Sequence, residues 1–242
     1  MFQKICAIGS YPRLSDHHRN FRQKLVLLFS IYGIIFLFNI LNAPLLYLWE
    51  YVVIHLLHYK SPVSQYKITM HSLFAKYGYW KAVLYISLLG PFIEEMIFRL
   101  SLSFKRKHIA AAFGFALVLL ARVIPGIRDQ DLALGIPIRI VLFAAGYFAF
   151  VKVLPQNISP NKRAQTFIIV ASIITFGLLH TLNYAPLQLG ILFIYPLYVL
   201  PQLVMGWLLT YVRFRNGFFW GIALHIMINS VIIIIQSVYQ HY

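Results

Sequence analysis

The sequence predicts an all-α protein, a polytopic bundle of transmembrane helices. Three features of the composition indicate this class: 60% of the 242 residues are hydrophobic, only 11% are charged, and the mean hydropathy is +0.74. An ordinary soluble domain carries roughly 25% charged residues. Because a helix needs about 20 apolar residues to cross a bilayer, the apolar runs of this chain predict about seven spans joined by short loops.

Seven apolar runs account for the predicted spans. The first, at residues 25–49, is too long for the core of a cleavable signal and lacks a small-residue cleavage site, so it is expected to stay in the protein. A polar, aromatic stretch at residues 50–79 follows, and its pattern predicts an interfacial amphipathic helix. The other runs lie at residues 81–104, 109–124, 134–154, 166–184, 187–211 and 218–239.

Basic residues set the predicted orientation. The chain has 21 Lys and Arg but 6 Asp and Glu, and its formal net charge is +15. The basic residues lie in loops and do not cluster with exposed aromatic residues, which argues against a nucleic-acid partner. About twice as many fall in the loops on the N-terminal side as on the opposite side, where Arg122 and Arg128 lie. The N-terminus is therefore predicted to be cytoplasmic, with the lipid bilayer as partner. The compact size favours a cell membrane, the bacterial inner membrane.

Few ionisable side chains lie inside the predicted spans, and they are the candidate functional residues: Glu94, Glu95, Arg99, Arg139, His180 and His225. A carboxylate at membrane depth costs on the order of 2.5–3.5 kcal/mol, so two adjacent glutamates need partners or a function. Arg139 matches no motif and is expected to pair or to snorkel. The same applies to Arg122, near the end of a short run.

Helical spacing separates the roles of the two glutamates. Residues four apart share a helix face, which pairs Glu95 with Arg99 and directs Glu94, rotated by about 100°, elsewhere. Gly90 and Pro91 just before them weaken the helix, because proline removes a backbone donor and favours a kink. Such a kink would admit water beside Glu94. The same four-residue spacing relates Phe176 to His180 and His225 to Asn229.

These side chains have the chemistry for hydrolysis of an amide bond. A carboxylate in a low-dielectric cavity binds protons more tightly, which moves Glu94 toward general-base work near neutral pH. Neutral imidazoles such as His180 and His225 can orient a water, donate to an oxyanion or bind a metal. The Asn229 amide can donate to developing negative charge. No Ser or Cys nucleophile is required.

Three motifs resemble those of a known family. Residues 94–99 match E-E-x-x-x-R, residues 176–180 match F-x-x-x-H, and residues 225–229 match H-x-x-x-N. In this order on separate hydrophobic helices, they look like the motifs of the CPBP family, the CAAX proteases and bacteriocin-processing enzymes also called the Abi family. The likeness covers residues 81–239. The resemblance implies an intramembrane protease core there, preceded at residues 1–80 by a basic tail, the first span and the interfacial segment.

By this resemblance, Glu94 is the catalytic base that activates water and His180 assists it. His225 and Asn229 complete the water-binding or oxyanion site. Glu95, Arg99 and Phe176 support them, Phe176 by packing and by excluding water. The expected substrate is a membrane-associated protein or peptide, either a prenylated protein tail or a leader peptide or bacteriocin.

The motifs leave metal dependence open. A catalytic zinc usually has three protein ligands and a water, and Glu94, His180 and His225 would meet that count. Cys6 is the only cysteine, so no Cys-based cluster is available. If Glu94 were a ligand it could not also be the free base. The sequence therefore favours a glutamate mechanism without a cofactor, with zinc as the alternative.

Two other function classes stay open at this stage. One is a non-catalytic membrane protein of the same fold, acting in bacteriocin immunity or as a secretion scaffold. The other is a proton-coupled transporter that uses Glu94 as its relay. The chain lacks a visible duplicated half such as many transporters show, which argues against the second.

Overall fold

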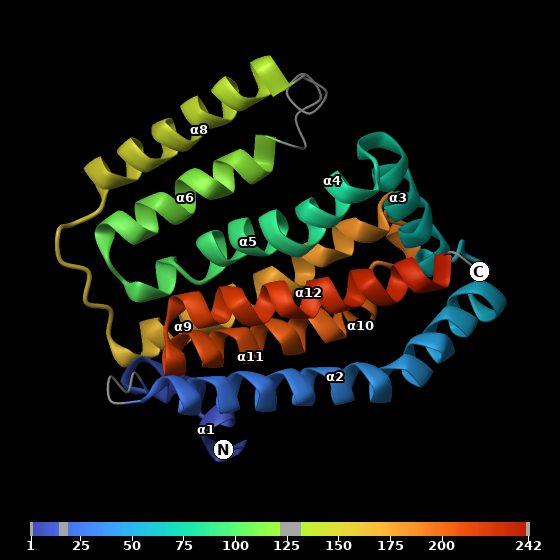
Figure 1. The fold of residues 1–242 in the computed structure, drawn as a ribbon, viewed down its shortest axis with the longest axis horizontal. Helices are drawn as coiled ribbons and strands as arrows, with labels where there is room; N and C mark the ends of the chain where they lie inside the picture. Colours follow the sequence, from blue (N-terminus) through green and yellow to red (C-terminus); the bar gives the residue numbers. More distant parts are fainter. Residues whose placement is uncertain (1, 15–18, 122–131, 241–242) are drawn as a thin grey trace. The chain divides into compact units, whose positions relative to one another are not determined.

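The computed structural model describes residues 2–14, 19–121 and 132–240, and this part of the chain contains helices and turns but no strand (Figure 1). Arg122 and Arg128 lie outside the described residues. The α-helices are α1 (Phe2–Cys6), α2 (Phe21–Tyr51), α3 (Pro62–Tyr77), α4 (Tyr79–Leu84), α5 (Gly90–Phe98), α6 (Arg106–Leu120), α8 (Leu132–Val153), α9 (Lys162–Leu179), α10 (Tyr195–Tyr198), α11 (Leu200–Asn216) and α12 (Phe218–Gln240). The 3₁₀ segments are η1 (Ile8–Arg13), η4 (Ser101–Ser103), η6 (His180–Tyr184) and η7 (Leu189–Ile191), and the π-helical segments are η2 (Val52–Leu56) and η3 (Tyr85–Leu89).

Four described helices are long and apolar enough to cross a membrane: Phe21–Leu56, Gly135–Val153, Lys162–Tyr184 and Phe218–Ile235. Each coincides with one of the predicted apolar runs. The expected class, an all-α polytopic membrane protein, is thereby confirmed. The number of seven spans is not, because the other three runs form shorter helices. The orientation of the N-terminus stays a prediction.

Proline explains why two of these runs are broken. The run at residues 81–104 is divided into α4, η3 and α5, and Pro91 is the second residue of α5. The run at residues 187–211 is divided into η7, α10 and α11, with a proline in the first turn of both α10 and α11. Because proline has no N–H to donate, it starts a helix more readily than it continues one. The apolar count alone could not reveal these breaks.

By their contacts, the residues fall into two compact units. Unit 1 comprises Met1–Pro91 and Val170–Tyr242, and unit 2 comprises Phe92–Ile169. The division at residue 80 that follows from the family resemblance is a different one, and it stays a prediction.

Unit 1 is built on three long helices. α11 packs against both α2 and α12, and α12 also packs against η3. A capping box fixes where α2 begins: the Asn20 side chain accepts from the Gln23 backbone N–H at 2.9 Å, and the Gln23 side chain accepts from the Asn20 N–H at 3.3 Å. These packed helices position His225, which lies on α12.

The N-terminal segment of unit 1 packs against α11 and forms a hydrogen bond with it. The buried Tyr11 ring packs against Tyr211 and Phe214, and its hydroxyl donates to the Ile5 carbonyl and accepts from Trp207 Nε1 at 2.8 Å. Burial is the main cause that raises the pKa of the Tyr11 phenol. The described residues 2–14, which precede the first predicted span, are therefore part of the folded unit.

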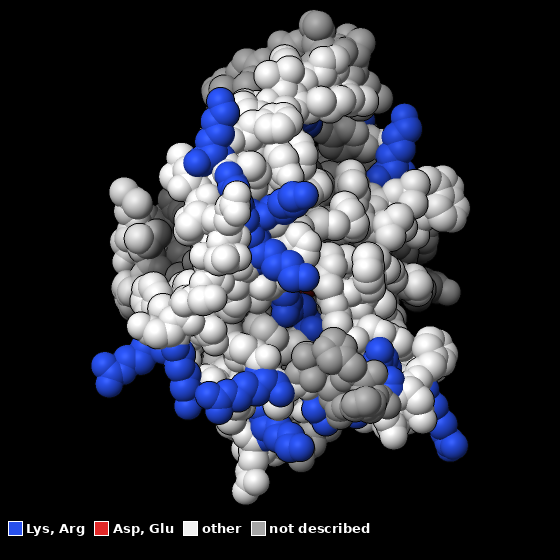
Figure 2. Space-filling view, turned by 90° about the vertical axis from the view of Figure 1, so that its left-hand side faces the viewer, with Lys and Arg blue, Asp and Glu red and all other residues white. Residues whose placement is uncertain are grey.

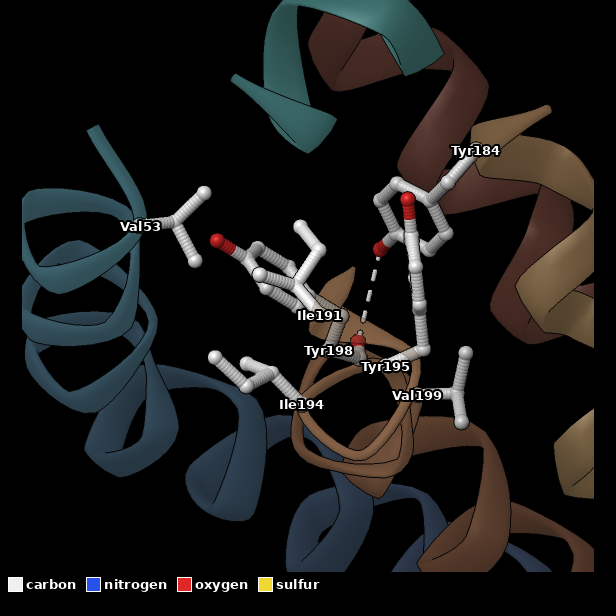
Figure 3. Packing of buried hydrophobic residues seen from close by; sticks show 7 residues of the cluster. All are labelled: Val53, Tyr184, Ile191, Ile194, Tyr195, Tyr198 and Val199. Carbon is white, nitrogen blue, oxygen red and sulfur yellow. Dashed lines mark hydrogen bonds between the residues drawn. The ribbon is translucent and has the colours of Figure 1, made fainter. Parts of the chain in front are cut away.

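A second core of unit 1 lies around the ends of α2 and α9. It consists of seven buried residues: Val53, Tyr184, Ile191, Ile194, Tyr195, Tyr198 and Val199 (Figure 3). The Tyr184 hydroxyl donates to the Tyr198 carbonyl at 3.4 Å, and the Tyr198 hydroxyl donates to Glu50 at 2.7 Å. Ser61, the N-cap of α3, also donates to Glu50. This core holds the segment η6, which begins at His180.

Unit 2 contains the α6–α8 hairpin, whose two helices lie side by side in Figure 1. The helices approach closely at two glycines: a Cβ on Gly114 would lie 2.8 Å from the Phe143 carbonyl oxygen, and one on Gly146 would lie 3.1 Å from Gly114 Cα. Phe113 stacks on Phe150 with ring centroids 3.7 Å apart. Small residues that let backbones approach are typical of helix pairs in membranes.

Lys and Arg side chains are spread over the face drawn in Figure 2, with hardly any acidic side chains among them. This agrees with the net charge of +15. Acidic side chains are scarce in this chain, so each buried one needs a physical explanation.

Candidate active site

Glu95 and Arg99 form a buried ion pair within one turn of the helical stretch around α5. The guanidinium Nη1 lies 3.1 Å from Glu95 Oε1, and both side chains are 0% exposed. The Arg99 backbone N–H also donates to the Glu95 carbonyl at 2.9 Å. The pairing predicted from the four-residue spacing is therefore confirmed. Since each charge neutralises the other, neither could be removed without leaving a buried charge.

Glu94 has a different environment from its neighbour. It lies on the same helix and in the same unit, but it is half-buried, whereas Glu95 is fully buried. Part of the Glu94 side chain is exposed, although its carboxylate oxygen Oε2 is itself buried. The structure therefore separates the two glutamates by burial, in the direction that the helical rotation predicts.

The helix is interrupted just before Glu94. Residues Tyr85–Leu89 form η3, in which the Gly90 N–H donates to the Tyr85 carbonyl five residues earlier. A Cβ on Gly90 would lie 3.1 Å from that carbonyl oxygen, so glycine suits this tight contact. The helix is thus irregular next to Gly90 and Pro91, as a π-helical segment that ends before Gly90, while the predicted kink and the water beside Glu94 stay predictions. Such segments inside α-helices occur frequently at functional sites.

Phe176, His180 and His225 come together in unit 1, and we call them the Phe176 cluster. The Phe176 ring centroid lies 4.8 Å from that of His180 and 5.7 Å from that of His225, in a T-shaped contact. Phe176 and His225 are both 0% exposed, and His180 is half-buried. Two motifs from separate helices, α9 and α12, therefore share one aromatic ring.

Hydrogen bonding fixes the tautomer of His180. Its Nδ1 lies 2.8 Å from the Phe176 carbonyl oxygen. A carbonyl can only accept, so Nδ1 carries the proton and Nε2 of the neutral ring carries the lone pair. This is the pairing that the F-x-x-x-H spacing predicts. Nε2 can then accept a hydrogen bond from water or bind a metal.

A close contact between α9 and α11 sets the position of the Phe176 cluster. Gly177 is buried, and a Cβ there would lie 2.4 Å from Leu203 Cδ2 and 3.0 Å from Leu203 Cα. The neighbour of Phe176 must therefore be glycine for the two helices to meet. Sequence reasoning missed this role, although a glycine between two motif residues was a usable signal.

Asn229 has a partner that the sequence did not predict. Its Nδ2 donates to the Ile86 carbonyl oxygen at 3.0 Å, and so links α12 to η3. His225, one turn earlier on α12, contacts Phe176. An Asn amide has two N–H groups, so the contact with Ile86 leaves a second one available for other acceptors.

The candidate residues carry side chains of the types that bind zinc, and the same side chains could also act without a metal. Within either unit, the described residues hold no group of three His, Cys, Asp or Glu side chains that could bind a metal ion. Imidazole nitrogen and carboxylate oxygen are zinc donors. A zinc-binding histidine usually donates its other N–H to a carbonyl or carboxylate, as His180 does to Phe176.

The structure thus groups the motif residues in two sets. Unit 1 contains the Phe176 cluster and Asn229, while unit 2 contains Glu94 with the Glu95–Arg99 pair. Arg139, which matched no motif, is half-buried on α8 in unit 2.

The family comparison covers all of these residues. A family model described as Type II CAAX prenyl endopeptidase Rce1-like matches residues 76–231, which is more than half of the chain. No curated protein and no solved structure matches the chain significantly. The matched range includes the three motifs, α4 and η3, and it leaves out the first span.

Proposed function

The chain belongs to the Rce1-like family of type II CAAX prenyl endopeptidases, and we propose that it hydrolyses a peptide bond of a membrane-associated substrate with a water activated by Glu94. The family supports an intramembrane endopeptidase in general, and the four apolar helices support a multi-pass membrane protein. The observation that carries the finer proposal is the difference in burial between the adjacent carboxylates. Glu95 is fully buried and paired with Arg99, whereas Glu94 is half-buried.

The proposed reaction needs no covalent enzyme intermediate. Glu94 takes a proton from water as the water oxygen attacks the scissile carbonyl carbon. The resulting oxyanion is stabilised by donors, for which His225 and Asn229 are proposed. When the C–N bond breaks, the proton held by Glu94 passes to the leaving amine. His180 accepts a hydrogen bond from the attacking water through Nε2, the nitrogen that its tautomer leaves unprotonated.

The supporting residues act on geometry. The Glu95–Arg99 pair fixes the turn of helix that follows Glu94, and both side chains are fully buried. Phe176 holds the two imidazole rings against one aromatic ring and excludes water from their faces.

For the substrate we propose the C-terminal CAAX sequence of a prenylated protein, which agrees with the description of the family as CAAX prenyl endopeptidases. A leader peptide or bacteriocin is the second class of substrate. Zinc is the second mechanism: Glu94, His180 and His225 would hold it, and it would supply Lewis-acid polarisation of the carbonyl. We favour the glutamate mechanism because a Glu94 that ligates a metal cannot also be the free base.

The test is cleavage by the purified full-length protein in lipid vesicles. The substrate is a farnesylated peptide that ends in a CAAX sequence, and the products are identified by mass spectrometry. We expect cleavage within the CAAX sequence, little cleavage of the same peptide without the lipid, and no cleavage by Glu94→Gln. Unchanged turnover in the presence of a zinc chelator would support the metal-free mechanism.

Two results would contradict the proposal. Cleavage by Glu94→Gln at the wild-type rate would exclude Glu94 as the base. If the wild-type protein cleaves neither the prenylated peptide nor a set of leader peptides, the non-catalytic alternative, an immunity or scaffold protein, gains support.

A further inference from the structure

We propose that Asn229 is a positioning residue: it supplies the hydrogen-bond donor that Pro91 lacks, and thereby maintains the π-helical break from which the Glu94 helix starts. The inference concerns η3 (Tyr85–Leu89), the first residues of α5 and one side chain of α12. All the contacts that carry it lie within unit 1.

The break removes main-chain donors from one carbonyl. In a regular α-helix, the Gly90 N–H would donate to the Ile86 carbonyl four residues earlier. Here it donates to Tyr85 instead. If the π pattern continued, the next N–H to reach Ile86 would be that of residue 91, but this residue is proline and has none. The Ile86 carbonyl is therefore left without a main-chain donor by the combination of a π turn and Pro91.

Asn229 supplies the missing donor from a distant part of the chain. Its Nδ2 lies 3.0 Å from the Ile86 oxygen, across a sequence separation of 143 residues. The hydrogen bond is part-buried, and carbonyls in the hydrocarbon region of a membrane need such protein partners because no water there replaces them. The contact also fixes the orientation of the amide, since only its NH₂ side can face a carbonyl.

The break determines where the Glu94 side chain points. A π turn inserts one residue into the helix, so every later side chain is rotated by about 100° relative to an uninterrupted α-helix. Glu94 lies four residues after Gly90 in α5 and is subject to this rotation. Without the contact from Asn229, the Ile86 carbonyl would lack a donor while Pro91 still prevents a regular α-helix, so the break and the orientation of Glu94 after it would no longer be fixed. The effect on turnover rests on the proposed function, whereas the effect on the break does not.

Hydrogen–deuterium exchange on the full-length protein in lipid nanodiscs tests the break directly. In Asn229→Ala, we expect the backbone amides of residues 84–94 to exchange at least about tenfold faster than in the wild type. The reason is that the π-helical segment has lost the hydrogen bond from Asn229 to the Ile86 carbonyl. The matched control is Ser230→Ala, the next residue on the same helix, which should leave the exchange unchanged. Equal protection in Asn229→Ala and the control would overturn the inference.

A second variant covers the case in which Asn229→Ala disturbs folding more widely. In the double variant P91A/N229A, the new alanine carries the N–H that Pro91 lacks, so a regular helix can form. We expect protection of residues 84–94 to return close to the wild-type level. Failure to recover it would mean that Asn229 does not act through the donor missing at Pro91.

Turnover separates this inference from the proposed function. If Asn229 positions the helix, P91A/N229A regains protection but not turnover, and Pro91→Ala alone also loses kcat while KM changes by less than about twofold. If Asn229→Ala loses turnover with unchanged exchange, the residue acts only on the substrate and the positioning role is wrong. If the wild type shows no peptidase activity, the proposed function fails, and the exchange experiment still decides the inference.

Discussion

The Glu95–Arg99 pair and the Phe176 cluster bury polar side chains in different ways. The pair lies on a single helical stretch, and its two charges cancel at 3.1 Å. The Phe176 cluster joins two helices, and its imidazoles are held by an aromatic ring and a main-chain carbonyl. The first arrangement depends on local spacing, so the sequence could predict it. The second depends on how α9, α11 and α12 pack, and single changes in that packing should disturb it.

The largest effect on stability should come from breaking the ion pair. Arg99→Met leaves the Glu95 carboxylate buried without its counter-charge, which should lower the free energy of unfolding by about 4 kcal/mol. Unfolding by SDS titration in mixed micelles measures this. The double variant E95M/R99M removes both charges and should recover most of the loss. If the double variant is as unstable as Arg99→Met, the pair is not the source of the effect.

The next effect should come from the aromatic centre of the Phe176 cluster. Phe176→Ala removes a ring that is 0% exposed and leaves a cavity between two helices, at a cost of about 3 kcal/mol in the same titration. Turnover should fall as well, because both imidazoles lose the ring that they contact. Phe167→Ala is the matched control, since this residue is 74% exposed on the same helix and should change little.

A smaller loss is expected from Gly177→Ala. The added Cβ would lie 2.4 Å from Leu203 Cδ2, and overpacking of this kind costs about 2 kcal/mol. The double variant G177A/L203A removes the obstructing side chain and should restore part of the stability. If Gly177→Ala unfolds like the wild type, the close approach of α9 and α11 does not hold the Phe176 cluster.

The smallest effect should lie in the N-terminal segment, which contains no motif. Tyr11→Phe removes the donor to Ile5 and the acceptor of Trp207, for about 1 kcal/mol. Because burial raises the pKa of Tyr11, its contribution is present below the ordinary tyrosine pKa near 10 and is lost as the pH rises above it. The loss of stability above pH 10 should therefore be smaller in Tyr11→Phe. Tyr47→Phe, at a residue that is 78% exposed, should match the wild type at every pH.

The sequence predicted the class of fold and the local pairs, but not the contacts between helices. The pairs Glu95–Arg99 and Phe176–His180 follow from four-residue spacing, and the break at Gly90 and Pro91 follows from residue type. The number of seven spans is not confirmed, and two of the apolar runs are divided near prolines, which an apolar count does not register. The contact of Asn229 with Ile86 could not be predicted, because it depends on which carbonyl a π turn leaves without a donor.

The separate roles proposed for the two adjacent glutamates can be tested by comparing two variants, Glu94→Gln and Glu95→Gln. For each variant, turnover of the prenylated peptide and thermal unfolding are measured. We expect Glu94→Gln to unfold at the wild-type temperature and to lose turnover by about a hundredfold or more. Glu95→Gln should unfold at a clearly lower temperature, because Arg99 then stays buried without its counter-charge. If Glu94→Gln retains turnover, or if the two variants lose stability equally, the two carboxylates do not have separate roles.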